Sequence, residues 1–345
     1  MSMMPSLALR FSQVQQASET YLMAKLVPLI LGSPGIGKSD LARIIAKKFN
    51  LFVIDIRLSQ HDPVDLSGFP SPRGNKVAYL PLDMFPLEGD PIPDGFSGWL
   101  LFLDELPSAA PATQAAAYKL ILDRMIGQYH LHKNVAIIAA GNKETDNAIV
   151  HPLSTALQSR FVHLELGIHL GDWLDWAASN NIDSRITSYL NFKQDHLYTF
   201  SPNHTDRTYA CPRTWAFVDA LIKKGKVDPT ERRNAHLFAG AISEGVAREF
   251  QEFCLIQDEL PSLADITSRP ETVHVSSDPS INFAMTGFLA GHATEQNFGA
   301  ILTYLTRLST EFQVICLRDI VRRHSNLRNN KHLLSWITTS GAQLF

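Results

Sequence analysis

The sequence predicts an α/β core built on a parallel β-sheet, followed by an all-α region. Two observations predict this fold: short apolar runs alternate with helical segments in the first half, and strand-like runs vanish beyond about residue 167. Continuous apolar runs of this kind are typical of strands that are covered on both faces, as in parallel sheets. Their alternation with helices predicts βαβ units with helices on both faces.

Five apolar runs, rich in branched and aromatic residues, are the predicted strands. They lie at 26–31, 51–56, 99–104, 135–140 and 161–166. Helices are expected at 39–49 and 112–125, between strands. From about 167 onward, apolar residues recur three and four positions apart, which is the spacing of amphipathic helices. The first half is therefore expected to hold the whole sheet.

The composition excludes several classes of protein. The chain has 345 residues, of which 45% are hydrophobic and 19% charged, so it is expected to bury a sizeable core. The net charge of −3 provides no global basic field for nucleic acid. The three cysteines, Cys211, Cys254 and Cys316, are too widely spaced for a disulfide framework or a zinc ribbon. With no signal peptide and no apolar run long enough for a membrane span, we expect a cytoplasmic protein.

A glycine-rich loop, GSPGIGKS, joins the first predicted strand to the first helix. Gly32, Gly37, Lys38 and Ser39 match the pattern GxxxxGK[ST]. The glycines permit close approach of backbone N–H groups to phosphate oxygens, and the helix dipole points its positive end at the same place. Lys38 would contact the β- and γ-phosphates of a nucleotide, and the Ser39 hydroxyl would bind Mg²⁺.

The alternative is an ordinary Gly/Pro turn, but the strand–loop–helix context favours a nucleotide. The residues expected to contact it are Gly32, Ser33, Pro34, Gly35, Ile36, Gly37, Lys38, Ser39 and Asp40.

Polar residues also end two later strands. Asp104 and Glu105 end the third, where Asp104 could hold Mg²⁺ through its water shell and Glu105 could polarise the attacking water. The alternative is an acidic pair that caps the next helix. Asn142 ends the fourth strand, where its amide could orient water against the γ-phosphate, unless it is simply a turn residue.

The order of these motifs resembles that of AAA+ ATPases. GSPGIGKS resembles the Walker A motif, LLFLDE the Walker B motif and IIAAGN the sensor 1 motif. Weaker features resemble the MoxR-type members of the helix-2-insert clade. These are two hairpins expected at 65–81 and 124–138, an arginine-finger segment at 156–166, and a lid-helix start at 211–215.

The resemblance implies a P-loop NTPase core at 1–166, a helical lid at 167–259 and a C-terminal helical extension at 260–345. It also implies a ring, usually a hexamer, with ATP between subunits. Arg160 would then act as a finger in the neighbour's site, rather than as a surface arginine. Arg213 would contact phosphates in its own or the neighbour's site, rather than carry a solvated head group.

Three functions stay open at this point. The first is a chaperone-like ATPase that remodels or activates a partner protein, often one with a von Willebrand A domain on a separate polypeptide. The second is a DNA-transaction protein such as a helicase loader or motor, and the third is a nucleotide-gated scaffold with negligible turnover. A basic cluster could contact DNA, although solvated cations at a helix end are the plainer interpretation. It consists of Arg318, Arg322, Arg323, Arg328 and Lys331.

Overall fold

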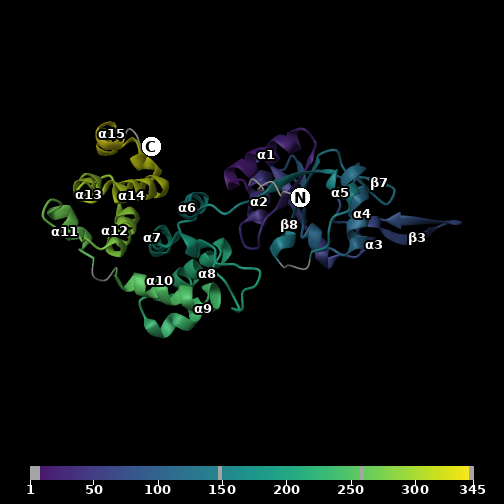
Figure 1. The fold of residues 1–345 in the computed structure, drawn as a ribbon. Coiled ribbons are helices and arrows are strands. Elements are labelled where there is room, and N and C mark those ends of the chain that lie inside the picture. Colours follow the sequence, from purple (N-terminus) through teal and green to yellow (C-terminus); the bar gives the residue numbers. More distant parts are fainter. Residues whose placement is uncertain (1–7, 147–149, 257–259, 342–345) are drawn as a thin grey trace, which may run out of the picture. The chain divides into compact units, whose positions relative to one another are not determined.

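The computed structural model describes residues 8–146, 150–256 and 260–341. The chain divides into two compact units, each described by itself below. The first runs to Ile168 and includes Ser201–Asn203, and the second holds His169–Phe200 and the chain from His204. Figure 1 shows the sheet in the purple-to-teal part of the chain, and helices throughout the green-to-yellow part.

The first unit contains a five-stranded parallel sheet with the strand order β2-β5-β8-β1-β9. The strands are β1 (Val27–Leu31), β2 (Leu51–Arg57), β5 (Gly98–Asp104), β8 (Val135–Gly141) and β9 (Phe161–Glu165). All five predicted strands are thus confirmed. The first six residues of β5 are buried, as expected for a central strand that is covered on both faces.

Helices cover the sheet and connect its strands. In the first unit they are α1 (Phe11–Met23), α2 (Lys38–Lys48), α3 (Pro63–Ser67), α4 (Pro111–Leu122) and α5 (Thr155–Gln158), with short 3₁₀ turns η1 (Leu58–Gln60), η2 (Leu106–Ser108) and η3 (Glu144–Asp146). The helix expected at 112–125 ends three residues early. Arg124 has a left-handed φ of 53°, which stops the helix, and Met125 begins a strand.

Both expected hairpins are present in the first unit. β3 (Phe69–Arg73) pairs with β4 (Lys76–Leu80), and β6 (Met125–Ile126) pairs with β7 (Tyr129–His130). The β3–β4 hairpin extends away from the sheet (Figure 1). A Cβ at Gly127 would lie 2.8 Å from the Ser67 carbonyl oxygen and 3.3 Å from the Tyr79 Cβ, so the turn of the second hairpin lies against the base of the first.

Within its described residues, the second unit is entirely helical, as the sequence predicts. Its helices are α6 (Leu170–Ser179), α7 (Ser184–Phe192), α8 (Pro212–Lys223), α9 (Ala235–Ile242), α10 (Glu244–Ile256), α11 (Leu263–Ser268), α12 (Pro279–His292), α13 (Phe298–Leu305), α14 (Thr310–Arg323) and α15 (Lys331–Trp336). Shorter segments are the 3₁₀ helices η4 (Gln194–Leu197), η5 (Arg232–Asn234) and η7 (Ser325–Asn329) and the π-helix η8 (Ile337–Gly341). No described helix has the length and apolar character that crossing a membrane requires.

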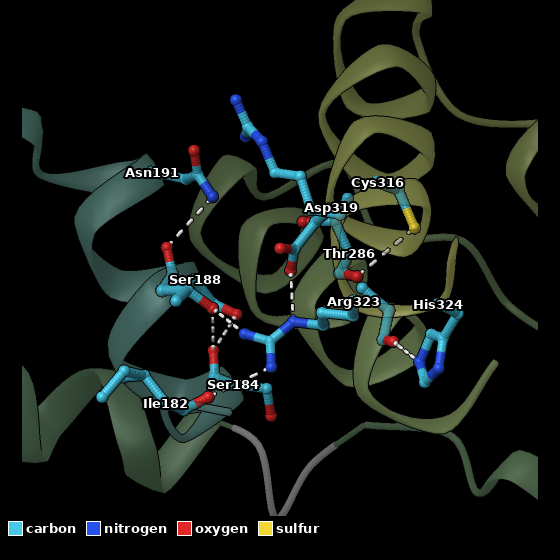
Figure 2. Close-up of polar contacts among 12 residues, drawn as sticks. Ile182, Ser184, Ser188, Asn191, Thr286, Cys316, Asp319, Arg323 and His324 are labelled. Atoms are coloured by element: carbon cyan, nitrogen blue, oxygen red, sulfur yellow. Dashed lines mark hydrogen bonds and ion pairs between the residues drawn. The ribbon is translucent and has the colours of Figure 1, made fainter. Parts of the chain in front are cut away.

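A buried polar network joins α14 to α7 in the second unit (Figure 2). Arg323 pairs with Asp319 at 3.1 Å, and both side chains are under a tenth exposed. The same guanidinium donates hydrogen bonds to the Ile182 carbonyl oxygen at 3.1 Å and the Thr187 hydroxyl at 2.6 Å. Helix α14, late in the chain, is therefore tied to the start of the helical unit.

The expected boundary between lid and extension falls inside this unit, where α7 packs against α12 and α12 against α14. The division into 1–166, 167–259 and 260–345 stays a prediction. Four stretches of it, residues 1–7, 147–149, 257–259 and 342–345, lie outside the described residues.

Candidate functional site

The glycine-rich loop curls between β1 and α2 in a conformation that favours glycine at several points. Gly35 and Gly37 have φ angles of 78° and 98°, in the left-handed region. A Cβ at Gly32 would lie 2.6 Å from the Ile36 Cδ1 and 3.0 Å from the Leu166 carbonyl oxygen. The loop therefore approaches its surroundings closely and leads directly into the first turn of α2.

Lys38 is buried inside this curl. Its Nζ donates hydrogen bonds to the carbonyl oxygens of Gly32 at 2.6 Å and Ser33 at 3.0 Å. It also donates to the Asn142 Oδ1 at 3.0 Å. Because β1 pairs with β8, with Leu31 opposite Gly141, the loop and Asn142 follow neighbouring strand ends. The structure thus brings Lys38 and Asn142 together.

Ser39 and Asp104 supply two oxygen ligands of the kind that Mg²⁺ prefers. The Ser39 hydroxyl donates a hydrogen bond to the Asp104 Oδ2 at 3.2 Å. Among the described residues, no group of three or more His, Cys, Asp or Glu side chains could form a metal cage. A Mg²⁺ ion keeps several waters and takes one or two carboxylates plus substrate phosphates, so this sparse pair fits it.

Glu105 has an unusual backbone, and its side chain has a partner on a neighbouring segment. Its φ is 58°, in the left-handed region that a residue with a Cβ rarely adopts, and such strain clusters at functional sites. Its backbone N–H donates to the Asp104 Oδ1 at 2.9 Å. Its carboxylate accepts a hydrogen bond from the hydroxyl of Ser59, in the η1 turn after β2.

Ser59 was not predicted from the sequence, since nothing near it forms a motif. The sheet register indicates this contact instead, because Arg57, two residues before Ser59, pairs with Asp104, which directly precedes Glu105.

Asp55 is a second residue near the site that the sequence analysis did not identify. It lies two positions before Arg57 on β2. Burial raises the pKa of the Asp55 carboxyl above its usual value, and the nearby negative charges of Asp104 and Glu105 raise it further, against the lowering effect of Arg57 and Arg43. The Arg43 Nη2 lies 3.7 Å from the Asp55 Oδ2. A third carboxyl group therefore borders the predicted Mg²⁺ ligand.

Asp146 is a third missed residue, in a stretch that reads as a polar turn after Asn142. Its Oδ1 accepts a hydrogen bond from the Ser33 hydroxyl at 3.1 Å, and its Oδ2 accepts one from the Lys143 backbone N–H at 3.3 Å. Lys143 forms an ion pair with Glu165 at the end of β9. The glycine-rich loop is thus fastened to the segment after β8.

Of the other loop residues, Gly35 and Ile36 are buried and Pro34 is half-buried. Asp40 is exposed in the first turn of α2 and forms an ion pair with Arg43 at 3.3 Å. The ring of Phe11 in α1 would lie 3.6 Å from a Cβ at Gly37. The sequence did not point to this contact, because α1 carries no motif.

Arg160 lies at the amino ends of the sheet strands, whereas the glycine-rich loop lies at their carboxyl ends. It directly precedes Phe161, which pairs with Val27 at the amino end of β1, whereas the loop follows Leu31 at the carboxyl end. Its guanidinium is exposed and donates to the Tyr118 hydroxyl and the Ser159 hydroxyl. The structure therefore does not bring Arg160 to the loop of its own subunit.

Arg213 is the second residue of α8 in the second unit, directly after Pro212, and its side chain is exposed. Its role at phosphates stays a prediction, as do the roles of the other site residues.

Comparison with known families bears on the first unit. Residues 28–161 match the family model of the AAA domain (dynein-related subfamily). The first unit has the P-loop AAA+ fold. The predicted fold class is thereby confirmed, and the resemblance to AAA+ proteins is confirmed at this level. A P-loop AAA+ domain is a nucleotide-binding fold, and here its loop and the ends of β5 and β8 meet at one edge of the sheet.

Similar solved structures include a RuvB variant from Thermotoga maritima, at 18% identity over 76% of each chain with a TM-score of 0.38. Another is a provisionally assigned ATPase from Cytophaga hutchinsonii, at 12% identity over 88% of this chain and 79% of that chain, with a TM-score of 0.35. At these low values neither likeness bears on function. A comparison with curated proteins finds no significant match.

Proposed function

We propose that the AAA domain binds ATP with Mg²⁺ and hydrolyses it. The observation that carries this proposal is the convergence of Lys38, Ser39, Asp104, Glu105 and Asn142 at the carboxyl edge of the sheet. In α/β sheets this edge is where ligands bind. The glycine-rich loop presents backbone N–H groups there, and Lys38 adds a positive charge for the phosphates.

Each residue has a separate task in this proposal. Ser39 and Asp104 hold Mg²⁺, which when bound neutralises charge on the phosphate oxygens. Glu105 accepts a proton from the attacking water. Asn142 orients that water or the γ-phosphate through its side-chain amide.

We further propose that the chain works as a ring, with six subunits the expected number. The position of Arg160 supports an assembly with shared sites, since its exposed guanidinium lies at the sheet edge opposite its own loop. A neighbouring subunit could receive it as a finger on the transferred phosphoryl group. Arg213 is proposed to contact phosphates from the lid.

The energy of hydrolysis is proposed to remodel or activate a partner protein in the cytoplasm, as in MoxR-like chaperones. The two hairpins support this subclass, because they stand where the resemblance expects inserts. On β3–β4, four large apolar side chains are exposed and available to a protein partner: Phe69, Val77, Tyr79 and Leu80. A separate polypeptide with a von Willebrand A domain is the partner class that we propose.

The two alternatives have less support. DNA binding through the basic cluster is disfavoured because Arg322 is paired with Asp175 at 2.6 Å and Arg323 with Asp319. These guanidiniums would have to give up carboxylates to reach phosphates. A scaffold with negligible turnover is disfavoured by the intact pair of Asp104 and Glu105.

The test is an ATPase assay on the full chain, alone, with DNA, and with proteins that co-purify with it. We expect Mg²⁺-dependent hydrolysis that a protein partner stimulates and DNA does not. The Lys38→Ala variant is the control. We expect it to lose tight ATP binding, because it removes the cation inside the loop. If Lys38→Ala binds ATP with unchanged affinity in a titration, the loop is not the nucleotide site.

A further inference from the structure

Arg160 and Tyr118 form a paired contact at the amino edge of the sheet. The Arg160 Nη2 donates a hydrogen bond to the Tyr118 hydroxyl oxygen at 3.1 Å. The guanidinium carbon also lies 5.7 Å from the centroid of the Tyr118 ring, within the range of a cation–π interaction. Two separate attractions therefore act between the same pair of side chains.

Tyr118 can fix the direction of the guanidinium because its own ring is fixed. It lies in α4, and the ring packs against the core cluster of the first unit, which includes Leu120 and Ile121 of the same helix. The Arg160 Nη1 donates to the Ser159 hydroxyl at 2.8 Å. The guanidinium is thus held at two nitrogen atoms. Of its two partners, Tyr118 is the one that is anchored against the core.

The chemistry of the partners is as informative as their positions. No carboxylate among the described residues pairs with Arg160, so the structure orients this cation without neutralising it. An acidic partner would have to be displaced before the guanidinium could meet a phosphate, whereas a hydroxyl and an aromatic face cost far less to exchange.

We propose that Tyr118 is the positioning residue for the Arg160 finger. This inference rests on the proposed function, in which Arg160 acts in the site of the neighbouring subunit. Tyr118 holds the guanidinium extended at the amino edge, so that less side-chain freedom is lost when a neighbour's γ-phosphate receives it.

The test is a double-mutant cycle in the steady-state ATPase rate of the assembled full-length protein. Tyr118→Leu keeps apolar volume and removes both contacts, so we expect kcat to fall about tenfold. Tyr118→Phe keeps the ring face and should lose only about two- to threefold. Because Tyr118 acts through Arg160, Tyr118→Leu should change the rate by less than about twofold when Arg160→Ala is already present.

Two controls separate positioning from damage to the fold. The affinity for ATP, measured by titration on each variant, should stay unchanged, because the glycine-rich loop lies at the opposite ends of the sheet strands. Tyr21→Phe removes a phenol hydroxyl for which no hydrogen bond appears in the described part of the chain, and its rate should match the unaltered protein.

Two results would overturn the inference, and they differ. If Tyr118→Leu slows the Arg160→Ala background as much as the unaltered one, Tyr118 acts independently of the finger while Arg160 keeps its role. If Arg160→Ala alone hydrolyses ATP at the full rate, the finger itself is wrong, and the positioning role falls with it.

Discussion

The carboxylates at the end of β5 differ in their surroundings although they are neighbours in the chain. Asp104 faces the Ser39 hydroxyl, whereas Glu105 turns toward Ser59 through a left-handed backbone. This divergence supports the separate roles that we propose for them, with Asp104 beside the predicted Mg²⁺ ligand Ser39 and Glu105 turned away from it.

Substitution of each carboxylate should therefore have a distinct effect. Glu105→Gln should keep ATP bound and slow turnover by roughly 10²–10⁴-fold, because it removes the base and leaves Asp104 in place. Asp104→Asn should weaken Mg²⁺-dependent binding and hydrolysis together. Binding titrations at several Mg²⁺ concentrations, beside turnover measurements, check this. The roles are reversed if Glu105→Gln is the variant that loses Mg²⁺ dependence.

Asp55 should make stability depend on pH. Its pKa is raised in the folded protein by burial and by Asp104, so the folded state binds this proton more tightly than the unfolded state. The contribution of Asp55 to the free energy of unfolding is thus full at low pH. It is lost as pH rises through the raised pKa.

We expect Asp55→Asn to raise the free energy of unfolding at pH 7 relative to the unaltered protein. The difference should vanish at a pH below the ordinary aspartate pKa, where both forms are neutral. Urea unfolding at the two pH values measures it. A stabilisation of the same size at both pH values would show that charge is not the cause.

Sequence patterns predicted the regular elements well and the contacts between distant elements poorly. The five strands follow from apolar runs because a buried parallel strand has few polar positions. Lys38, Asp104 and Asn142 could be proposed from the sequence because each stands at a strand end or in a loop of recognisable spacing. Ser59, Asp55 and Asp146 were missed because their partners depend on sheet order and register, which a local pattern does not contain.

Helix packing in the second unit gives a further prediction. A Cβ at Gly287 of α12 would lie 1.4 Å from the Ser188 Oγ and 2.7 Å from its Cβ, so α12 and α7 approach too closely for any side chain there. Gly287→Ala should lower the free energy of unfolding by about 1–3 kcal/mol through overpacking.

Gly240→Ala in α9 is the matched control, since its added Cβ meets nothing within 4 Å. Because alanine favours a helix over glycine, we expect this variant to gain about 0.5–1 kcal/mol. Chemical denaturation of both variants checks the pair. Equal effects of the two substitutions would contradict the close contact between α7 and α12.

At the scale of the whole molecule, the glycine-rich loop and Arg160 lie at opposite ends of the sheet strands. The proposed activity therefore requires assembly, because Arg160 would act in a neighbour's site. Specific ATPase activity should rise with protein concentration as rings form. Arg160→Ala should bind ATP normally and hydrolyse it at least about 10³-fold more slowly. Rates across a dilution series, with the assembly state measured by light scattering, check this. A stable monomer with full, concentration-independent activity would refute it.

The buried guanidinium of Arg323 couples the opening of α7 to that of α14, although two of its partners lie 136 and 141 positions away in the chain. If either helix opened, the guanidinium that is buried beside Asp319 would lose its hydrogen bonds to the Ile182 carbonyl oxygen and the Thr187 hydroxyl at once, and leaving a desolvated charge without these partners is costly. The amide hydrogens of both helices should therefore exchange with solvent in one cooperative step. A chain shortened to end before α14 would lose slow exchange in α7 as well, without any change to the sequence of α7. Mass-spectrometric hydrogen exchange on the two lengths would reveal that shared protection.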